Sequence, residues 1–164
     1  MTINEGVRTI GGLPGPGSIV NPSGTIVNRD PVLTLDVLSA PIAICRLAPD
    51  TAIPDWVWQA RDFITLSRTR LELSITVDEA VVPAGLPAQR GYRALKVRGT
   101  LSFGLVGILL QIMEPLAKAG LPVSAVSTHD TDYILVKGAD LDLAIHALEV
   151  AGHHIVRRSD GLTV

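Results

Sequence analysis

The sequence predicts an α+β protein in which helices cover one face of antiparallel sheets. From residue 87 onward the chain runs strand, helix, strand, strand, helix, strand, and its hydrophobic residues follow the period of each element. Residues 29–86 repeat the strands of this order with shorter helices. The order is the split βαβ pattern of ferredoxin-like domains. We therefore expect two βαββαβ units in tandem, the first of them degenerate.

A leader and a central break divide the chain. Residues 1–28 are so rich in glycine and proline that we expect a flexible leader without regular elements. Pro83, Gly85 and Pro87 interrupt the chain again near its middle. These positions predict a leader at residues 1–28, a first unit at residues 29–86 and a second unit at residues 87–164.

The first unit is expected to consist mainly of strands. Apolar stretches predict strands at residues 32–38, 42–47, 63–66 and 71–77. Pro54 and Asp55 predict the start of a short helix, because proline suits the first helical position and a carboxylate suits the first turn. A second short helix is expected at residues 78–82, and no closing strand is evident after it.

The second unit has clearer periodicity. We expect strands at residues 92–98, 123–126, 133–136 and 153–156, and helices at residues 105–119 and 141–151. Gly120 is expected to end the first helix in a left-handed conformation. Pro115 lies inside that helix and removes one backbone hydrogen bond, so we expect a kink or a loose last turn.

An internal repeat supports the tandem organisation. One alignment of the two halves places Ser67 on Ser127 and Glu72 on Asp132, together with the apolar residues that follow. The alignment predicts that the turn after residue 66 and the turn after residue 126 are the same structural feature.

Composition and charge argue against nucleic acid and membrane as partners. The formal net charge is -2, the basic residues are scattered and aromatic residues make up 4%, so neither a phosphate-binding face nor a base-stacking platform is expected. The longest apolar run, residues 105–110, is far below the roughly 18 residues of a membrane span.

The chain is expected to be cytoplasmic, because its N-terminal residues lack the apolar core of a signal peptide. Cys45 is the single cysteine, and its apolar neighbours predict a buried core position. A mean hydropathy of +0.37 in a chain of this size indicates buried interface as well as core, so we expect a homodimer or another homo-oligomer.

Residues 99–148 resemble ACT domains. The resemblance rests on the helix at residues 107–120 and on the string from Ser127 to Val136, and residues 63–77 are similar to the matching strand pair of a first ACT-like unit. The chain is most similar to tandem ACT-like proteins related to aspartokinase regulatory domains and to CASTOR-type arginine sensors. This resemblance implies a regulatory, allosteric, non-enzymatic protein that binds a small molecule, an amino acid, where ACT units meet, without cofactor or metal.

The implied ligand site combines the loop that opens the helix with the strand-turn-strand string. A glycine-containing loop at a helix N-terminus presents free N–H groups to an α-carboxylate, and a turn aspartate can accept hydrogen bonds from an ammonium group. The expected ligand-binding residues are Ser102, Phe103, Gly104, Leu105, Val106, Gly107, Thr128, His129, Asp130 and Asp132.

Simpler interpretations of these residues stay open. Aspartates in turns commonly bond their own backbone, and for Asp132 this competes evenly with ligand contact. His129, His153 and His154 lack a recognised metal-ligand spacing, so we expect solvated loop histidines.

Two rival functions remain: an interaction or oligomerisation module without ligand, and a small enzyme with Asp132 or His129 as general base. The expected partners are a small molecule, further copies of the chain and a regulated protein.

Overall fold

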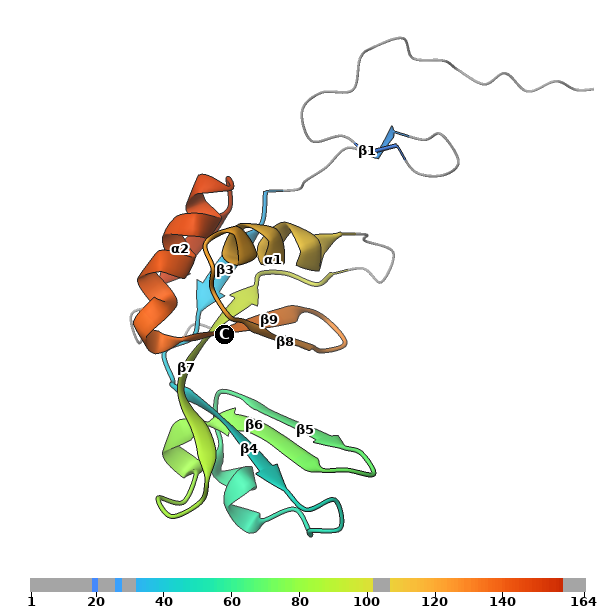
Figure 1. The fold of residues 1–164 in the computed structure, drawn as a ribbon, viewed down its shortest axis with the longest axis vertical. Coiled ribbons are helices and arrows are strands. Elements are labelled where there is room, and N and C mark those ends of the chain that lie inside the picture. The colour runs from blue at the N-terminus through green and yellow to red at the C-terminus, as the bar shows by residue number, and fades with distance from the viewer. Residues whose placement is uncertain (1–18, 21–25, 28–31, 102–106, 158–164) are drawn as a thin grey trace, which may run out of the picture. The chain divides into compact units, whose positions relative to one another are not determined.

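The computed structural model describes residues 19–20, 26–27, 32–101 and 107–157 (Figure 1). It divides into two compact units, residues 1–31 and residues 32–164. Among the helices of these described residues, none is long and apolar enough to cross a membrane.

The smaller unit, residues 1–31, contains a pair of short strands. Strands β1 (Ile19–Val20) and β2 (Ile26–Val27) are antiparallel, with Ile19 opposite Val27. The expectation that the leader has no regular element was therefore wrong. All four paired residues are Ile or Val, whose branched side chains favour extended backbone even between glycines and prolines.

In the larger unit, residues 32–164, one sheet is built from residues 42–97. Its strands are β4 (Ile42–Leu47), β5 (Ile64–Arg68), β6 (Leu73–Asp78) and the first half of β7 (Ala88–Val97), in the order β7-β4-β6-β5. All neighbours in this sheet are antiparallel. The short helices are 3-10 helices, η1 (Asp55–Gln59) and η2 (Glu79–Val81), near the predicted positions.

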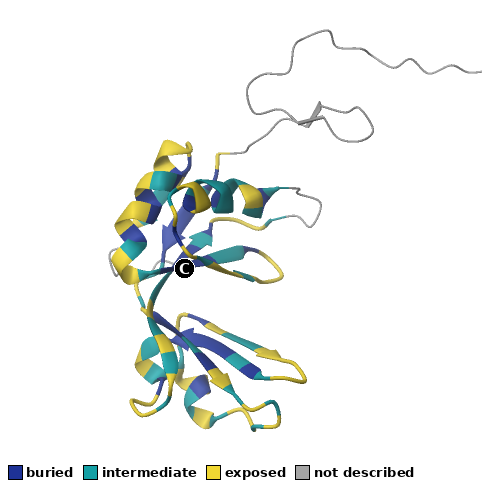
Figure 2. Ribbon diagram, in the orientation of Figure 1, coloured by how far each residue is buried: buried dark blue, intermediate teal, exposed yellow. Residues whose placement is uncertain are grey.

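A second sheet carries the two α-helices. Its strands are β10 (His154–Arg157), β3 (Thr34–Val37), β7, β9 (Asp132–Lys137) and β8 (Ser124–Ser127), in that order. The helices are α1 (Ile108–Lys118) and α2 (Leu141–Val150), the second preceded by the 3-10 helix η3 (Gly138–Asp140). Both α-helices pack on one face of this sheet, and their buried residues share one core with it (Figures 1 and 2). The predicted α+β, ferredoxin-like architecture is confirmed.

Strand β7 belongs to both sheets and joins them into one continuous eight-stranded sheet. Residues near its start pair with β4, and residues 92–97 pair with β9 and β3. The sequence shows no closing strand for residues 29–86. In the structure the start of β7 takes this place, just before the strand predicted at residues 92–98.

Strand β3 lies between β7 and β10, antiparallel to the first and parallel to the second. A segment from before the expected boundary at residue 86 therefore completes the sheet after it. The division into units at residues 29–86 and 87–164 stays a prediction.

The repeat is present with a different register. Thr69 N–H donates to the carbonyl of Glu72 and Thr128 N–H to the carbonyl of Thr131, each at 2.9 Å. The hydroxyl of each threonine accepts the N–H of the residue three positions later, each at 3.2 Å. The two turns are thus the same feature, as predicted, but Thr69 corresponds to Thr128, whereas the sequence alignment places it on His129.

The corrected register also matches the cores. It places Ile75 on Ile134 and Val77 on Val136, and all four are fully buried. Since side chains alternate between the faces of a strand, an error of one residue exchanges the buried face for the exposed one.

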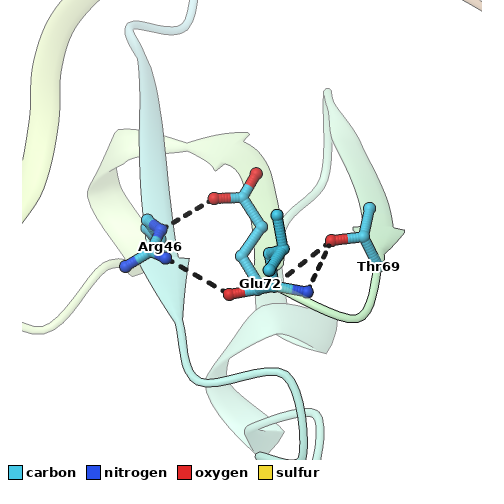
Figure 3. A network of polar contacts seen from close by, with 4 residues as sticks. Arg46, Thr69 and Glu72 are labelled. Atoms are coloured by element: carbon cyan, nitrogen blue, oxygen red, sulfur yellow. Dashed lines mark hydrogen bonds and ion pairs between the residues drawn. The ribbon is translucent and has the colours of Figure 1, made fainter.

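The turn between β5 and β6 is tied to the neighbouring strand β4 (Figure 3). Thr69 Oγ1 accepts the N–H of Leu71 at 3.1 Å. Arg46 donates from Nε to Glu72 Oε2 at 2.8 Å and from Nη2 to the carbonyl of Leu71 at 3.2 Å. The guanidinium of Arg46 is therefore committed to closing the β5-β6 hairpin.

Buried side chains form separate clusters in the two sheets. The first sheet buries Cys45 and Val57 completely, so the expected core position of the cysteine is confirmed. Trp56 packs against this cluster, whereas Trp58 is 62% exposed. Phe63 and Tyr133 connect the sheets, with ring centroids 4.8 Å apart.

Candidate functional site

A cavity of about 300 Å³ lies where the start of α1 meets the turn between β8 and β9. It is formed by one apolar and one polar group of residues. The described residues that line it are Leu101, Gly107, Ile108, Leu109, Leu110, Ser127, Thr128, His129, Asp130, Thr131 and Asp132.

The turn on one side of the cavity is held by its own threonines. Thr128 Oγ1 donates to the carbonyl of Thr131 at 2.8 Å, in addition to the backbone bond between these residues. The hydroxyl of Thr131, whose side chain is buried, donates to the carbonyl of Val97 at 2.6 Å. These bonds fix the turn to the end of β7.

A second link joins the turn to the chain that leads toward α1. The N–H of Leu101 donates to the carbonyl of Asp130 at 2.7 Å. A backbone hydrogen bond therefore ties the turn to Leu101, which also lines the cavity.

The two carboxylates at the turn have different surroundings. Asp132 is half-buried, and its Oδ1 accepts the hydroxyl of Ser127 at 2.5 Å. Asp130 is exposed, and its Oδ1 lies 2.8 Å from Nδ1 of His129. These bonds go to neighbouring side chains, in contrast to the common use of a turn aspartate, which bonds its own backbone.

The opposite side is the start of an α-helix. Gly107 has φ of +87°, a left-handed conformation that favours glycine, and its carbonyl accepts the first helical hydrogen bond from Gln111 at 3.0 Å. No acidic residue lies in the first turn, so the partial positive charge of the helix N-terminus is not neutralised there. Ile108, Leu109 and Leu110 add apolar surface next to these N–H groups.

Half of the residues predicted for the site can be placed. Gly107, Thr128, His129, Asp130 and Asp132 all line the cavity. The other half, Ser102, Phe103, Gly104, Leu105 and Val106, lies outside the described residues.

Sequence reasoning missed the anchoring residues. The role of Thr131 as the partner of Thr128 in the turn can be recognised only once the register of the hairpin is known. Leu101 is recognisable only from its backbone bond to Asp130.

The histidines do not gather into a metal site. Among the described residues, no three His, Cys, Asp or Glu side chains lie close enough together to hold a metal ion. His129 and His154 are exposed, but His153 is 6% exposed, so its assignment as a solvated loop residue was wrong. In this buried position both ring nitrogens have a backbone partner, the N–H of Leu33 and the carbonyl of Gln111.

Two side chains with shifted pKa values lie away from the cavity. Burial raises the pKa of the Cys45 thiol, and the charge of Arg90 offsets part of that shift. A hydrogen bond from Arg98 to Asp36 raises the pKa of the guanidinium. Both shifts follow from strand packing in the sheets.

Known protein families match both halves of the chain. An ACT domain model matches residues 88–150, from the start of β7 to the end of α2. A second model, for the N-terminal domain of another family, matches residues 41–85.

Solved structures match most of the chain. A protein from Agobacterium tumefaciens is 30% identical, with a TM-score of 0.75 over 82% of this chain and 100% of its own. A Vibrio cholerae protein of unknown function, described as a possible transport protein, is 17% identical, with a TM-score of 0.62 over 74% of this chain and 91% of its own.

The regulatory subunit of aspartate kinase from Thermus thermophilus, in its ligand-free form, is 13% identical, with a TM-score of 0.53 over 74% of this chain and 99% of its own. At these lower identities the likeness concerns the fold. The ACT match over β7, α1, β8, β9 and α2 shows that residues 88–150 form an ACT domain, and by this domain the chain belongs to the ACT-domain family.

Proposed function

We propose that this protein is a non-enzymatic regulatory module that binds a free amino acid in the cavity between the start of α1 and the β8-β9 turn. The observation that carries the proposal is the meeting of three chemistries in that one cavity. A helix N-terminus, an apolar patch and two carboxylates line about 300 Å³, a volume at the lower end of small-molecule sites.

Each part of an amino acid has a counterpart. The α-carboxylate suits the N–H groups of the first turn of α1, where the helix dipole favours negative charge. The α-ammonium suits Asp132, whose Oδ1 is already oriented by the Ser127 hydroxyl. The side chain of the ligand would contact Ile108 to Leu110, so an uncharged or apolar amino acid fits better than a basic one.

The relatives agree with a regulatory role. The Thermus thermophilus protein with this fold is named as a regulatory subunit, and an aspartokinase III structure from Escherichia coli with this fold contains aspartate and ADP. We extend the proposal to a homo-oligomer in the cytoplasm whose contact with a protein partner changes on binding. Such a change requires that the ligand bind two arrangements with different affinity.

The test is a thermal-shift panel of the twenty amino acids at millimolar concentration. A ligand that binds only the native state must raise the melting temperature in a saturable way. Asp132→Asn should reduce that rise strongly, whereas Asp142→Asn, on the exposed face of α2, should leave it unchanged.

Absence of any shift in the unmodified protein would contradict the proposal. Weight would then pass to an interaction module without ligand, and light scattering together with partner capture would follow. A turnover activity abolished by Asp132→Asn would instead support an enzyme.

A further inference from the structure

A second cleft, of about 380 Å³, lies between the two sheets of the larger unit. Strands β4, β5 and β6 form one wall, and β8 and β9 form the other. All the polar side chains that line it carry hydroxyl groups. These belong to Thr65, Ser67, Ser74, Thr76, Ser124 and Ser127.

The hydroxyls on the first wall are arranged by strand register. Thr65 lies opposite Thr76, and Ser67 lies opposite Ser74, in the antiparallel β5-β6 pair. Directly opposed residues point to the same face of a sheet, so these four form two adjacent rows. A ligand in the cleft would meet several donors and acceptors at fixed spacing.

Thr76 is the key residue of this wall. It is 7% exposed, and among residues 32–101 and 107–157 no group hydrogen-bonds to its hydroxyl. The hydroxyl oxygen keeps some accessible surface, because among the described residues the fully buried side-chain polar atoms without a partner are Arg93 Nε and Gln111 Oε1. Because Thr76 lines the cleft, a ligand that enters there can replace water as the partner of this hydroxyl.

The cleft offers no counter-charge to an ion. No Asp, Glu, Lys, Arg or His lines it among the described residues, and Ile44, Val126 and Leu135 complete its surface. Arg46, which lies opposite Ser74 in the β4-β6 pair, is committed to Glu72 and Leu71 (Figure 3). Moving a charged ligand into such a site would cost solvation without compensation.

We propose that this cleft is a second binding site, for a neutral polyhydroxylated molecule such as a sugar or cyclitol. Serine and threonine hydroxyls both donate and accept, which matches ligand hydroxyls that do the same. The apolar residues of the cleft suit the C–H faces of a ring. The site is separate from the proposed amino-acid cavity, and Ser127 is the one described residue that lines both.

The test uses saturation-transfer difference NMR on the full chain with myo-inositol and D-glucose as probes. D-Glucuronate serves as a charged match to D-glucose. We expect saturable transfer from at least one neutral probe and binding at least about ten-fold weaker for D-glucuronate. Thr76→Val, which keeps the shape of the side chain, should weaken binding about five-fold or more.

Thr34→Val is the matched control, because Thr34 lies on β3 and does not line the cleft. Ser74→Ala provides a second variant if Thr76→Val does not fold. The proposal is overturned if neither neutral probe shows saturable transfer, or if Thr76→Val and Ser74→Ala bind as the Thr34→Val control does. A response to amino acids that depends on Asp132 would persist in that case, so the two proposals fail separately.

Discussion

The ring of His153 donates from Nε2 to the carbonyl oxygen of Gln111, at a distance of 3.3 Å. In an uninterrupted helix that carbonyl would accept the N–H of residue 115, but residue 115 is a proline and has none. Nδ1 of the same ring accepts the N–H of Leu33 at 3.4 Å. One buried imidazole thus compensates for the proline and joins α1 to the segment before β3.

Replacing His153 with leucine should destabilise the fold. The substitution leaves the Gln111 carbonyl and the Leu33 N–H without partners, so we expect a loss of about 1–3 kcal/mol in the free energy of unfolding. Urea denaturation measures it. His154→Leu is the control, because that side chain is exposed and a change within about 0.5 kcal/mol is expected. Equal effects of the two substitutions would contradict this role for His153.

Pro115→Ala should make His153 less important. Alanine restores an N–H that can bond the Gln111 carbonyl inside the helix, and it also has the higher helix propensity. We expect His153→Leu to cost about 1 kcal/mol less in the alanine background than in the natural one. A double-mutant cycle by urea denaturation measures this coupling. The same cost in both backgrounds would show that the two residues act independently.

Asp78 should be among the most important polar residues of the first sheet. Its buried carboxylate accepts the backbone N–H groups of Arg61, Asp62 and Phe63 at 2.8, 2.9 and 2.9 Å. Asp78→Ala removes all three bonds, and we expect a loss of about 2–4 kcal/mol. Asp62→Ala is the matched control on an exposed side chain. A melting temperature no lower than that of the control would refute the prediction.

The two repeated turns separate stability from ligand binding. Thr69→Ala and Thr128→Ala each remove a hydroxyl that holds a hairpin turn, and each should cost about 1 kcal/mol. Only Thr128 lines the cavity proposed to bind an amino acid, so under that proposal only Thr128→Ala should also weaken a thermal shift caused by an amino acid. Serine at either position should restore the stability. Equal loss of ligand response in both alanine variants would place the site elsewhere.

Cys45 should be unreactive in the native protein. Its thiol is fully buried, and burial raises its pKa, so less of the reactive thiolate is present at pH 8 than for an ordinary cysteine. We expect Ellman's reagent to react at least about 100-fold more slowly than in guanidinium chloride. Comparable rates in the two solutions would show that β4 opens readily.

Local patterns in the sequence were sufficient for most elements. The apolar run at residues 42–47 is β4, and the amphipathic stretch at residues 141–151 is α2 within one residue. Gly120 ends α1 with φ of +74°, as its position predicted. These features depend on side chains that are neighbours along the chain, so the sequence contains the relevant information directly.

Part of the candidate site could also be predicted from local patterns in the sequence. Gly107 at a helix start and the carboxylates of a short turn are local signals, and the structure places Gly107, Asp130 and Asp132 around one cavity. Residues such as Thr131, which holds the turn by bonding the distant Val97, carry no local signal.

What the sequence by itself determined was the type and order of most strands and helices after residue 31 and the likeness of the two hairpin turns. Only the tertiary structure decided that β7 serves both sheets, that β3 lies between β7 and β10, that Thr69 corresponds to Thr128 in the repeat, and that His153 is buried against Gln111. The reason is physical. Strand neighbours and register are set by hydrogen bonds and packing between segments far apart in the chain, and a single-residue shift that exchanges the faces of a strand hardly changes its local pattern.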